Sequence, residues 1–237
     1  MMNRETLSSS EVNNILRAYR QATDIAGRGG SPDEEIAAYN KVIELGRRNG
    51  NVGPEEALKY NMIMYWSYNN LADALFNKSF KNALNATGDN RRAFAESLKY
   101  YRRGLKFAQD NLEKVSVLNR MAENYKYLGD EKHLCKIKQR VIANFNAEDK
   151  RRAYCDVAGE VKDPKCAAAM YEEALNYVND EKVSLPKKFE NTLFICEKLL
   201  TLYDKRKNRK NYQRILTLRE NTQNLLTTCQ KKGGCSF

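Results

Sequence analysis

Two short apolar patterns with helical spacing follow one another in residues 96–130, and they constrain the fold more than any other feature of the chain. Both combine small and large apolar residues three and four positions apart: Ser97, Leu98, Tyr101, Gly104 and Leu105, then Leu118, Met121, Ala122, Tyr125 and Gly129. Residues at these distances lie on one face of a helix. A short polar segment at 109–111 separates the patterns. The region therefore predicts two helices joined by a turn.

The composition extends this prediction to the whole chain. Only 4 Pro and 12 Gly occur in 237 residues, and 42% of the residues are hydrophobic while 30% are charged. Runs of β-branched residues with frequent turn signals, which strands require, are missing. No apolar stretch reaches the roughly 18 residues of a membrane helix, and the first residues lack the apolar core of a secretory signal. We therefore expect an all-α, cytoplasmic protein that does not enter a membrane.

Paired helical patterns recur along the sequence, and they suggest one helical domain over 11–228 between flexible ends at 1–10 and 229–237. The domain divides into five predicted pairs of helices: 11–49, 55–110, 112–145, 148–179 and 186–228. The second pair is longer than the others. We expect its additional residues, 77–89, to extend the first helix of that pair.

As an ensemble, the pairs over about 11–225 resemble the tetratricopeptide repeat (TPR). The second-helix pattern of this family is clearest in Ala167, Ala168, Tyr171, Ala174 and Leu175. The aromatic anchors Tyr19 and Tyr39 also have the spacing of about twenty residues that the family shows. The resemblance implies a right-handed α-α superhelix, a TPR-like solenoid of about ten antiparallel helices in five pairs.

The resemblance also implies a binding surface, because the first helices of successive pairs line a concave groove that holds peptides in this family. The groove positions are polar and mixed in charge: Arg17, Arg20, Asp24, Asn69, Asn70, Asp73, Asn119, Arg120 and Glu123. Such side chains can hydrogen-bond the backbone and end groups of a peptide. We therefore expect a non-enzymatic scaffold or adaptor that binds a peptide or protein segment.

One subset of the family clamps the C-terminal carboxylate of heat-shock chaperones, and three residues fall at clamp positions here. They are Arg20, Asn70 and Arg120, whose guanidinium and amide groups suit a carboxylate. Asp24 and Ser116 depart from the clamp pattern, in which an Asn and a Lys occupy those positions. We therefore favour general peptide binding over this specific partner.

The net charge of +11 suggests an acidic partner and keeps a second class of function open. The densest positive charge is a basic patch formed by Lys205, Arg206, Lys207, Arg209 and Lys210. This patch is either solvated surface or a contact for nucleic acid, with RNA binding as the alternative function. Most tyrosines occupy predicted core positions and are unavailable for stacking on bases. Self-association through the end of the array or the elongated second pair is a further possibility.

Residue types that support catalysis or metal binding are scarce. The single histidine, His133, cannot complete a Cys/His zinc set or a Ser-His-Asp triad, and we expect it at the surface or at a helix cap. No glycine-rich phosphate loop follows a predicted strand. The six cysteines show no CxxC spacing, so we expect reduced thiols, with pairing of Cys229 and Cys235 left open. We predict no enzyme activity, cofactor or metal.

Overall fold

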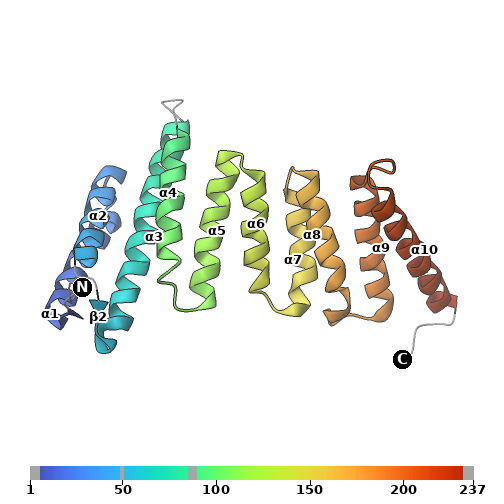
Figure 1. Ribbon diagram of the computed structural model, residues 1–237, viewed down its shortest axis with the longest axis horizontal. Helices are drawn as coiled ribbons and strands as arrows, with labels where there is room; N and C mark the ends of the chain where they lie inside the picture. The colour runs from blue at the N-terminus through green and yellow to red at the C-terminus, as the bar shows by residue number, and fades with distance from the viewer. Residues whose placement is uncertain (1–5, 49–50, 85–89, 232–237) are drawn as a thin grey trace, which may run out of the picture. The chain divides into compact units, whose positions relative to one another are not determined.

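The chain is described by a computed structural model over residues 6–48, 51–84 and 90–231 (Figure 1). This part of the chain contains ten α-helices, one 3-10 turn and one pair of two-residue strands. The chain divides into two compact units, Met1–Asp130 and Glu131–Phe237. None of the described helices has both the length and the apolar composition needed to cross a membrane. The all-α class is confirmed.

Unit 1 contains five helices, each packed against its neighbour along the chain. They are α1 (Ser9–Gly27), α2 (Pro32–Arg48), α3 (Pro54–Leu84), α4 (Asn90–Gly104) and α5 (Asn111–Leu128). Within the unit, consecutive helices run in opposite directions and follow sequence order, as Figure 1 shows. This neighbour-to-neighbour packing is compatible with a helical repeat.

Local chemistry explains where these helices begin and end. Ser8 and Glu11 form a capping box at the start of α1. Ser31 and Glu34 exchange the equivalent bonds before α2, with Ser31 N and Oγ 2.8 and 2.9 Å from the same carboxylate oxygen. Gly129 adopts φ 68° after α5, in the left-handed region that glycine tolerates best. These contacts satisfy backbone groups that a helix end leaves unpaired.

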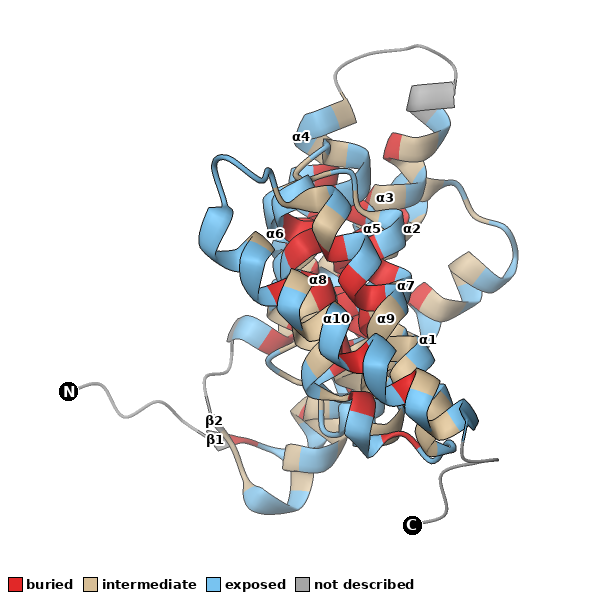
Figure 2. Cartoon of the chain, turned by 90° about the vertical axis from the view of Figure 1, so that its right-hand side faces the viewer, coloured by how far each residue is buried: buried red, intermediate tan, exposed pale blue. Residues whose placement is uncertain are grey.

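The core of unit 1 combines aliphatic residues with buried tyrosines. Tyr39, Tyr65 and Tyr101 are each at most 2% exposed. Buried and exposed residues alternate along single helices at helical spacing, a pattern that is also visible in the helices nearest the viewer in Figure 2. The stripes predicted from spacing thus mark the faces that helices bury against each other.

Two details of unit 1 differ from the expectations. Secondary structure begins within the predicted end at 1–10, because Thr6 and Leu7 of β1 pair in parallel with Asn51 and Val52 of β2, and α1 begins at Ser9. The last residues of the predicted second pair are also not helical, because α4 ends at Gly104. Phe107 then packs its ring 5.7 Å from that of Tyr68. The predicted extension at 77–89 appears in α3 as far as Leu84, and residues 85–89 lie outside the described residues.

Unit 2 also contains five helices that pack in sequence order. They are α6 (Glu131–Ala143), α7 (Ala147–Glu160), α8 (Pro164–Asn176), α9 (Leu185–Leu202) and α10 (Arg209–Lys231), with the 3-10 turn η1 (Val178–Asp180) before α9. The unit has its own core, in which Met170, Ile195, Leu199 and Ile215 are fully buried. The unit boundary falls between α5 and α6 and therefore divides the predicted pair 112–145.

The expectation of reduced thiols is wrong for Cys135 and Cys166, which form a disulfide between α6 and α8. Their Cα atoms are 6.0 Å apart although 31 residues separate them in sequence. The pairing results from the packing of two helices, so no short cysteine motif in the sequence predicts it. Cys155 and Cys196 are free. The open question about Cys229 and Cys235 involves Cys235, which lies outside the described residues.

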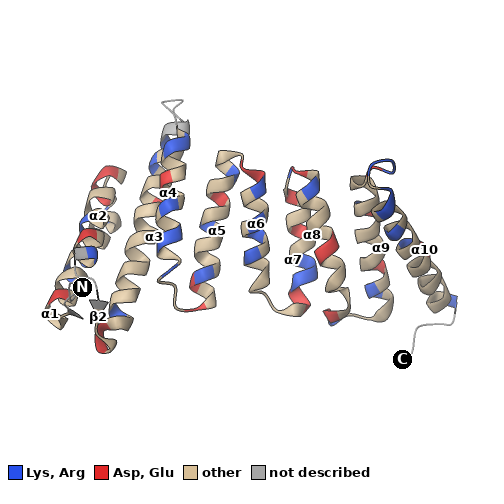
Figure 3. Cartoon of the chain, viewed as in Figure 1, with Lys and Arg blue, Asp and Glu red and all other residues tan. Residues whose placement is uncertain are grey.

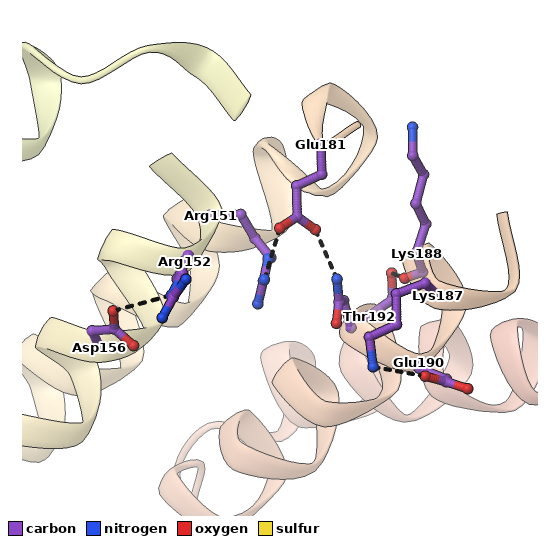
Figure 4. A network of polar contacts seen from close by, with 9 residues as sticks. Arg151, Arg152, Asp156, Glu181, Lys187, Lys188, Glu190 and Thr192 are labelled. Carbon is purple, nitrogen blue, oxygen red and sulfur yellow. Dashed lines mark hydrogen bonds and ion pairs between the residues drawn. The ribbon is translucent and has the colours of Figure 1, made fainter. Parts of the chain in front are cut away.

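A buried ion pair connects α7 with the segment before α9 (Figure 4). The guanidinium of Arg151 lies 2.7 Å from one carboxylate oxygen of Glu181, and Asn191 Nδ2 donates to the other at 2.7 Å. The two charged side chains are only 15% and 9% exposed. Glu181 therefore connects the segment after α8 to α7 through Arg151 and to α9 through Asn191.

We predict that Glu181→Gln destabilises unit 2 by about 3 kcal/mol, because it leaves the guanidinium of Arg151 buried without its counterion. The free energy of unfolding from urea titration measures this effect. The matched control is Glu190→Gln, which removes a carboxylate whose ion pair with Lys187 is more than half exposed. The control should cost less than about 1 kcal/mol. Equal losses of stability in the two variants would contradict a special role for Glu181.

Candidate functional site

A cavity of about 340 Å³ lies between α3 and α5 of unit 1. Its lining comes from three helices: Phe76, Asn77 and Phe80 from α3, Tyr101 from α4, and Arg120, Glu123 and Tyr127 from α5. The helices α3 and α5 were both predicted to contribute groove residues. The structure therefore brings Arg120 and Glu123, two of the predicted residues, to one cavity. We call this feature the α3/α5 cavity.

Asp73 is the polar centre beside the α3/α5 cavity. Its carboxylate accepts a hydrogen bond from the hydroxyl of Tyr101, and Oδ1 lies 3.6 Å from Nε of Arg120. Burial raises the pKa of Asp73, while the Tyr101 hydrogen bond and the Arg120 charge act in the opposite direction. Burial, followed by the charge of Asp73, raises the pKa of Tyr101. Asp73 is thus a partly buried carboxylate that contacts two cavity-lining side chains, Tyr101 and Arg120.

Asn70 forms a second polar centre on α3, one turn before Asp73. Its Nδ2 donates to the hydroxyl of Tyr39 at 3.1 Å, and the rings of Tyr39 and Tyr19 are 6.5 Å apart. Burial raises the pKa of Tyr19 and of Tyr39, against the effect of Asn70. Tyr39 of α2 and Tyr101 of α4 therefore direct their hydroxyls to two polar residues of α3, Asn70 and Asp73.

Asn69 is not a groove residue, and the prediction for it is wrong. Its side chain is 6% exposed, and among the described residues neither amide atom has a hydrogen-bond partner. It faces α4, where a Cβ added to Gly104 would lie 2.6 Å from Asn69 Oδ1. Helical spacing alone could not decide which of two adjacent asparagines points to solvent.

The remaining groove predictions fall on exposed positions outside the cavity lining. Arg17, Arg20 and Asp24 are exposed on α1, and Asn119 is exposed on α5. The three clamp candidates are also not equivalent. Arg20 is exposed, whereas Asn70 bonds Tyr39 and Arg120 pairs with Asp73. Two of the three clamp candidates thus have contacts within the fold, and the third has a free position on the surface of α1 in the described residues.

The sequence did not predict an aromatic wall beside the cavity. We use this name for Phe76 and Phe80 of α3, Phe94 of α4 and Tyr127 of α5. The ring of Tyr127 lies 5.6 Å from those of Phe76 and Phe80, and 5.4 Å from that of Phe94. Tyr127 is 47% exposed, so the wall has an open side. The only signal in the sequence was the four-residue spacing of Phe76 and Phe80, which does not reveal that α5 supplies a third ring.

A stripe of exposed apolar residues continues along α3 toward its N-terminus. Leu58, Met62 and Trp66 follow at intervals of four and are 69%, 42% and 44% exposed. This spacing places them on one side of the helix, in line with Asn70 and Asp73. Soluble proteins rarely leave large apolar side chains in a continuous row without a binding role. We call these three residues the α3 apolar stripe.

The predicted basic patch lies in unit 2, before and at the start of α10 (Figure 3). All five residues, Lys205, Arg206, Lys207, Arg209 and Lys210, are exposed. Asp204 Oδ1 accepts backbone hydrogen bonds from Arg206 and Lys207, which lower the pKa of Asp204 and shape the turn. A shallow hollow of about 670 Å³ extends along α10, lined by Arg209, Lys210, Gln213, Arg214 and Thr217.

Within the described residues, no three His, Cys, Asp or Glu side chains are grouped so that they could hold a metal ion. His133 is exposed on α6.

Comparisons with known proteins provide a weak fold likeness. No family model matches the chain, and no curated protein matches it. Among solved structures, the crystal structure of BtubC (BKLC) from P. vanneervenii is 12% identical, with a TM-score of 0.31, over 94% of this chain and 93% of that chain. A TM-score this low carries no argument about function.

We predict that the stability difference between Asp73→Asn and the unchanged protein depends on pH. Because the folded pKa of Asp73 is raised, the folded state binds this proton more readily than the unfolded state. Between the two pKa values, the stability contributed by this group falls as pH rises. The free energy of unfolding of Asp73→Asn should therefore rise relative to that of the unchanged protein as pH rises from about 4 to 7. Urea titrations across this range measure it, and a variant that becomes less stable relative to the parent as pH rises would contradict the burial of the charge.

Proposed function

We propose that the protein is a TPR-like helical-repeat adaptor that binds a peptide segment of another protein across the α3/α5 cavity and the α3 apolar stripe. The observation that supports this proposal is the α3/α5 cavity itself. It joins an aromatic wall to Asn77, Arg120 and Glu123 on two of the helices expected to form the groove. A right-handed superhelical arrangement of the helix pairs is part of the proposal.

The mixture of surfaces favours a peptide over a small metabolite. The α3 apolar stripe and the cavity are separated along α3 by the polar residues Asn70 and Asp73. An extended or helical segment could bury apolar side chains at one end and place a polar or charged one in the cavity. Interfaces with an apolar, aromatic centre and a polar rim are typical of protein recognition.

The expected cytoplasmic location stays a prediction. The disulfide between Cys135 and Cys166 bears on it, because such bonds persist mainly in oxidising compartments. Mass-spectrometric mapping of these two cysteines in protein taken directly from its source would show which state the cell maintains.

The peptide-binding proposal can be tested with Trp66, the single tryptophan of the chain, which lies in the α3 apolar stripe and is 44% exposed. Proteins that bind the full chain are captured from the native cell, and overlapping peptides that cover their sequences are synthesised. Each peptide is titrated into the protein while Trp66 emission is recorded. We expect at least one peptide to shift the emission saturably, because a bound segment removes water from the indole.

Paired variants then locate the binding surface. Asn77→Arg with Asn119→Arg adds bulk and charge at a cavity-lining position of α3 and at the exposed position before Arg120 on α5, and should raise the dissociation constant at least about tenfold. The control, Ala37→Arg with Ala95→Arg, adds the same groups at exposed positions of α2 and α4. Equal effects of the two pairs, or no saturable peptide, would overturn the proposal.

Nucleic-acid binding is a second candidate, supported by the exposed cations of the basic patch. Among the residues that the structure describes, no ion pair involves Lys205, Arg206 or Lys207. Cations without counterions can release the ions condensed on a phosphate backbone.

We predict that any binding of a random single-stranded oligonucleotide weakens steeply with salt. Changing Lys205, Arg206 and Lys207 to Gln should reduce the log–log salt slope by about 0.7 for each phosphate that the variant no longer neutralises. Fluorescence anisotropy measures both the affinity and its salt slope. Absence of binding at low salt would eliminate this function and leave the patch as solvated surface.

A further inference from the structure

The α3/α5 cavity has a charge balance unlike that of the chain as a whole. Among its lining residues, Arg120 and Glu123 are charged, and the charge of Arg120 is matched by Asp73 at 3.6 Å. In the described part of the chain, Glu123 has no ion-pair partner. Counted over the lining residues and Asp73, the charges sum to one net negative charge in a protein whose net charge is +11, while Lys81 and Lys126 stand exposed on α3 and α5 beside the lining residues Phe80 and Tyr127.

The aromatic side of the cavity adds to the same preference. Phe76, Phe80 and Tyr127 line it, with Tyr127 edge-on to both phenylalanines at 5.6 Å. The faces of aromatic rings are electrostatically negative and attract cations, most strongly where water is excluded. A carboxylate and three aromatic rings that line one cavity form a complementary environment for a positive group on an apolar stem.

We infer that the α3/α5 cavity receives a positively charged side chain, lysine or arginine, from the bound segment. This inference rests on the proposed peptide binding and specifies the partner. The aliphatic stem of the side chain packs on the aromatic wall, and its charged end reaches the carboxylate of Glu123. A cavity of about 340 Å³ has room for a long side chain of this kind.

Other occupants fit this cavity less well. An apolar side chain would cover Glu123 without providing a partner, which leaves a desolvated charge unpaired. An acidic side chain would meet the negative charge of Glu123, and it would have to share the one lining cation, Arg120, with Asp73. Lys78, the neighbour of a lining residue, pairs with Asp33 and so does not supply a free positive charge. More distant cations are screened beyond about 8 Å at physiological salt.

Small probes test the cavity directly on the full chain. N-acetyl-arginine amide and its uncharged analogue N-acetyl-citrulline amide are titrated while the NMR signals of labelled phenylalanine and tyrosine rings are followed. We expect saturable shifts of Phe76, Phe80 and Tyr127, with the arginine probe binding about 5- to 30-fold more tightly than the citrulline probe. Equal affinities, or no binding of the arginine probe, would overturn the inference.

Two substitutions separate the effect of the charge from that of the ring faces. Glu123→Gln keeps the shape of the side chain and should bring the arginine-to-citrulline affinity ratio close to one. Phe80→Leu should weaken binding of the arginine probe at least about threefold while leaving Glu123 in place. Glu220→Gln removes an exposed carboxylate of α10 in the other unit and should change neither value.

The peptide assay distinguishes this inference from the function on which it rests. If a peptide shifts Trp66 emission, its lysines and arginines are replaced one at a time by norleucine and citrulline. We expect one of these replacements in the peptide to weaken its binding to the unchanged protein. The same replacement should have little effect on binding to the Glu123→Gln variant, because that variant lacks the carboxylate with which the positive side chain pairs. A peptide that binds as well without any positive side chain would contradict the cation site and leave peptide binding intact.

Discussion

Buried tyrosines that direct a hydroxyl to a neighbouring helix are the interaction on which the described structure depends. The rings of Tyr39 and Tyr101 are almost completely buried, yet their hydroxyls reach Asn70 and Asp73 on α3. The buried Tyr125 and the partly buried Tyr203 have similar contacts, with hydroxyls bonded to Arg102 and Glu172. A buried tyrosine contributes a large apolar area but requires a polar partner for its hydroxyl. Each ring therefore fixes both the packing of a helix and the place of one polar residue.

This dual role explains how much of the fold could be predicted from the sequence. Helical spacing is a local signal, and it predicted an all-α chain in which consecutive helices pack against each other. The contacts between Tyr101 and Asp73, and between Cys135 and Cys166, join residues 28 and 31 positions apart. Such pairings depend on the rotation and depth of each packed helix, which periodicity does not determine.

The candidate site shows the same limit. Sequence reasoning identified Asp73, Arg120 and Glu123 as polar residues of first helices, and the structure groups them at one cavity. The aromatic wall was not predicted, because its rings come from α3, α4 and α5 and meet only after the helices pack. The misassignment of Asn69 arose in the opposite way. Its position in the pattern was suitable, but the close approach of Gly104 turns it into the interior.

A comparison of the two buried acids shows why one marks a candidate site and the other a structural support. Glu181 in unit 2 is bonded by Arg151 and Asn191 and is 9% exposed, so its hydrogen-bonding capacity is used within the fold. Asp73 in unit 1 keeps about one third of its side chain exposed, and its guanidinium partner is 3.6 Å away on a side chain that is 60% exposed. A fully enclosed pair resists change, because separating it leaves a charge without water or counterion. A half-open pair beside a cavity stays in contact with solvent, and this difference in burial is the reason that we propose the α3/α5 cavity, and not the surroundings of Glu181, as a recognition site.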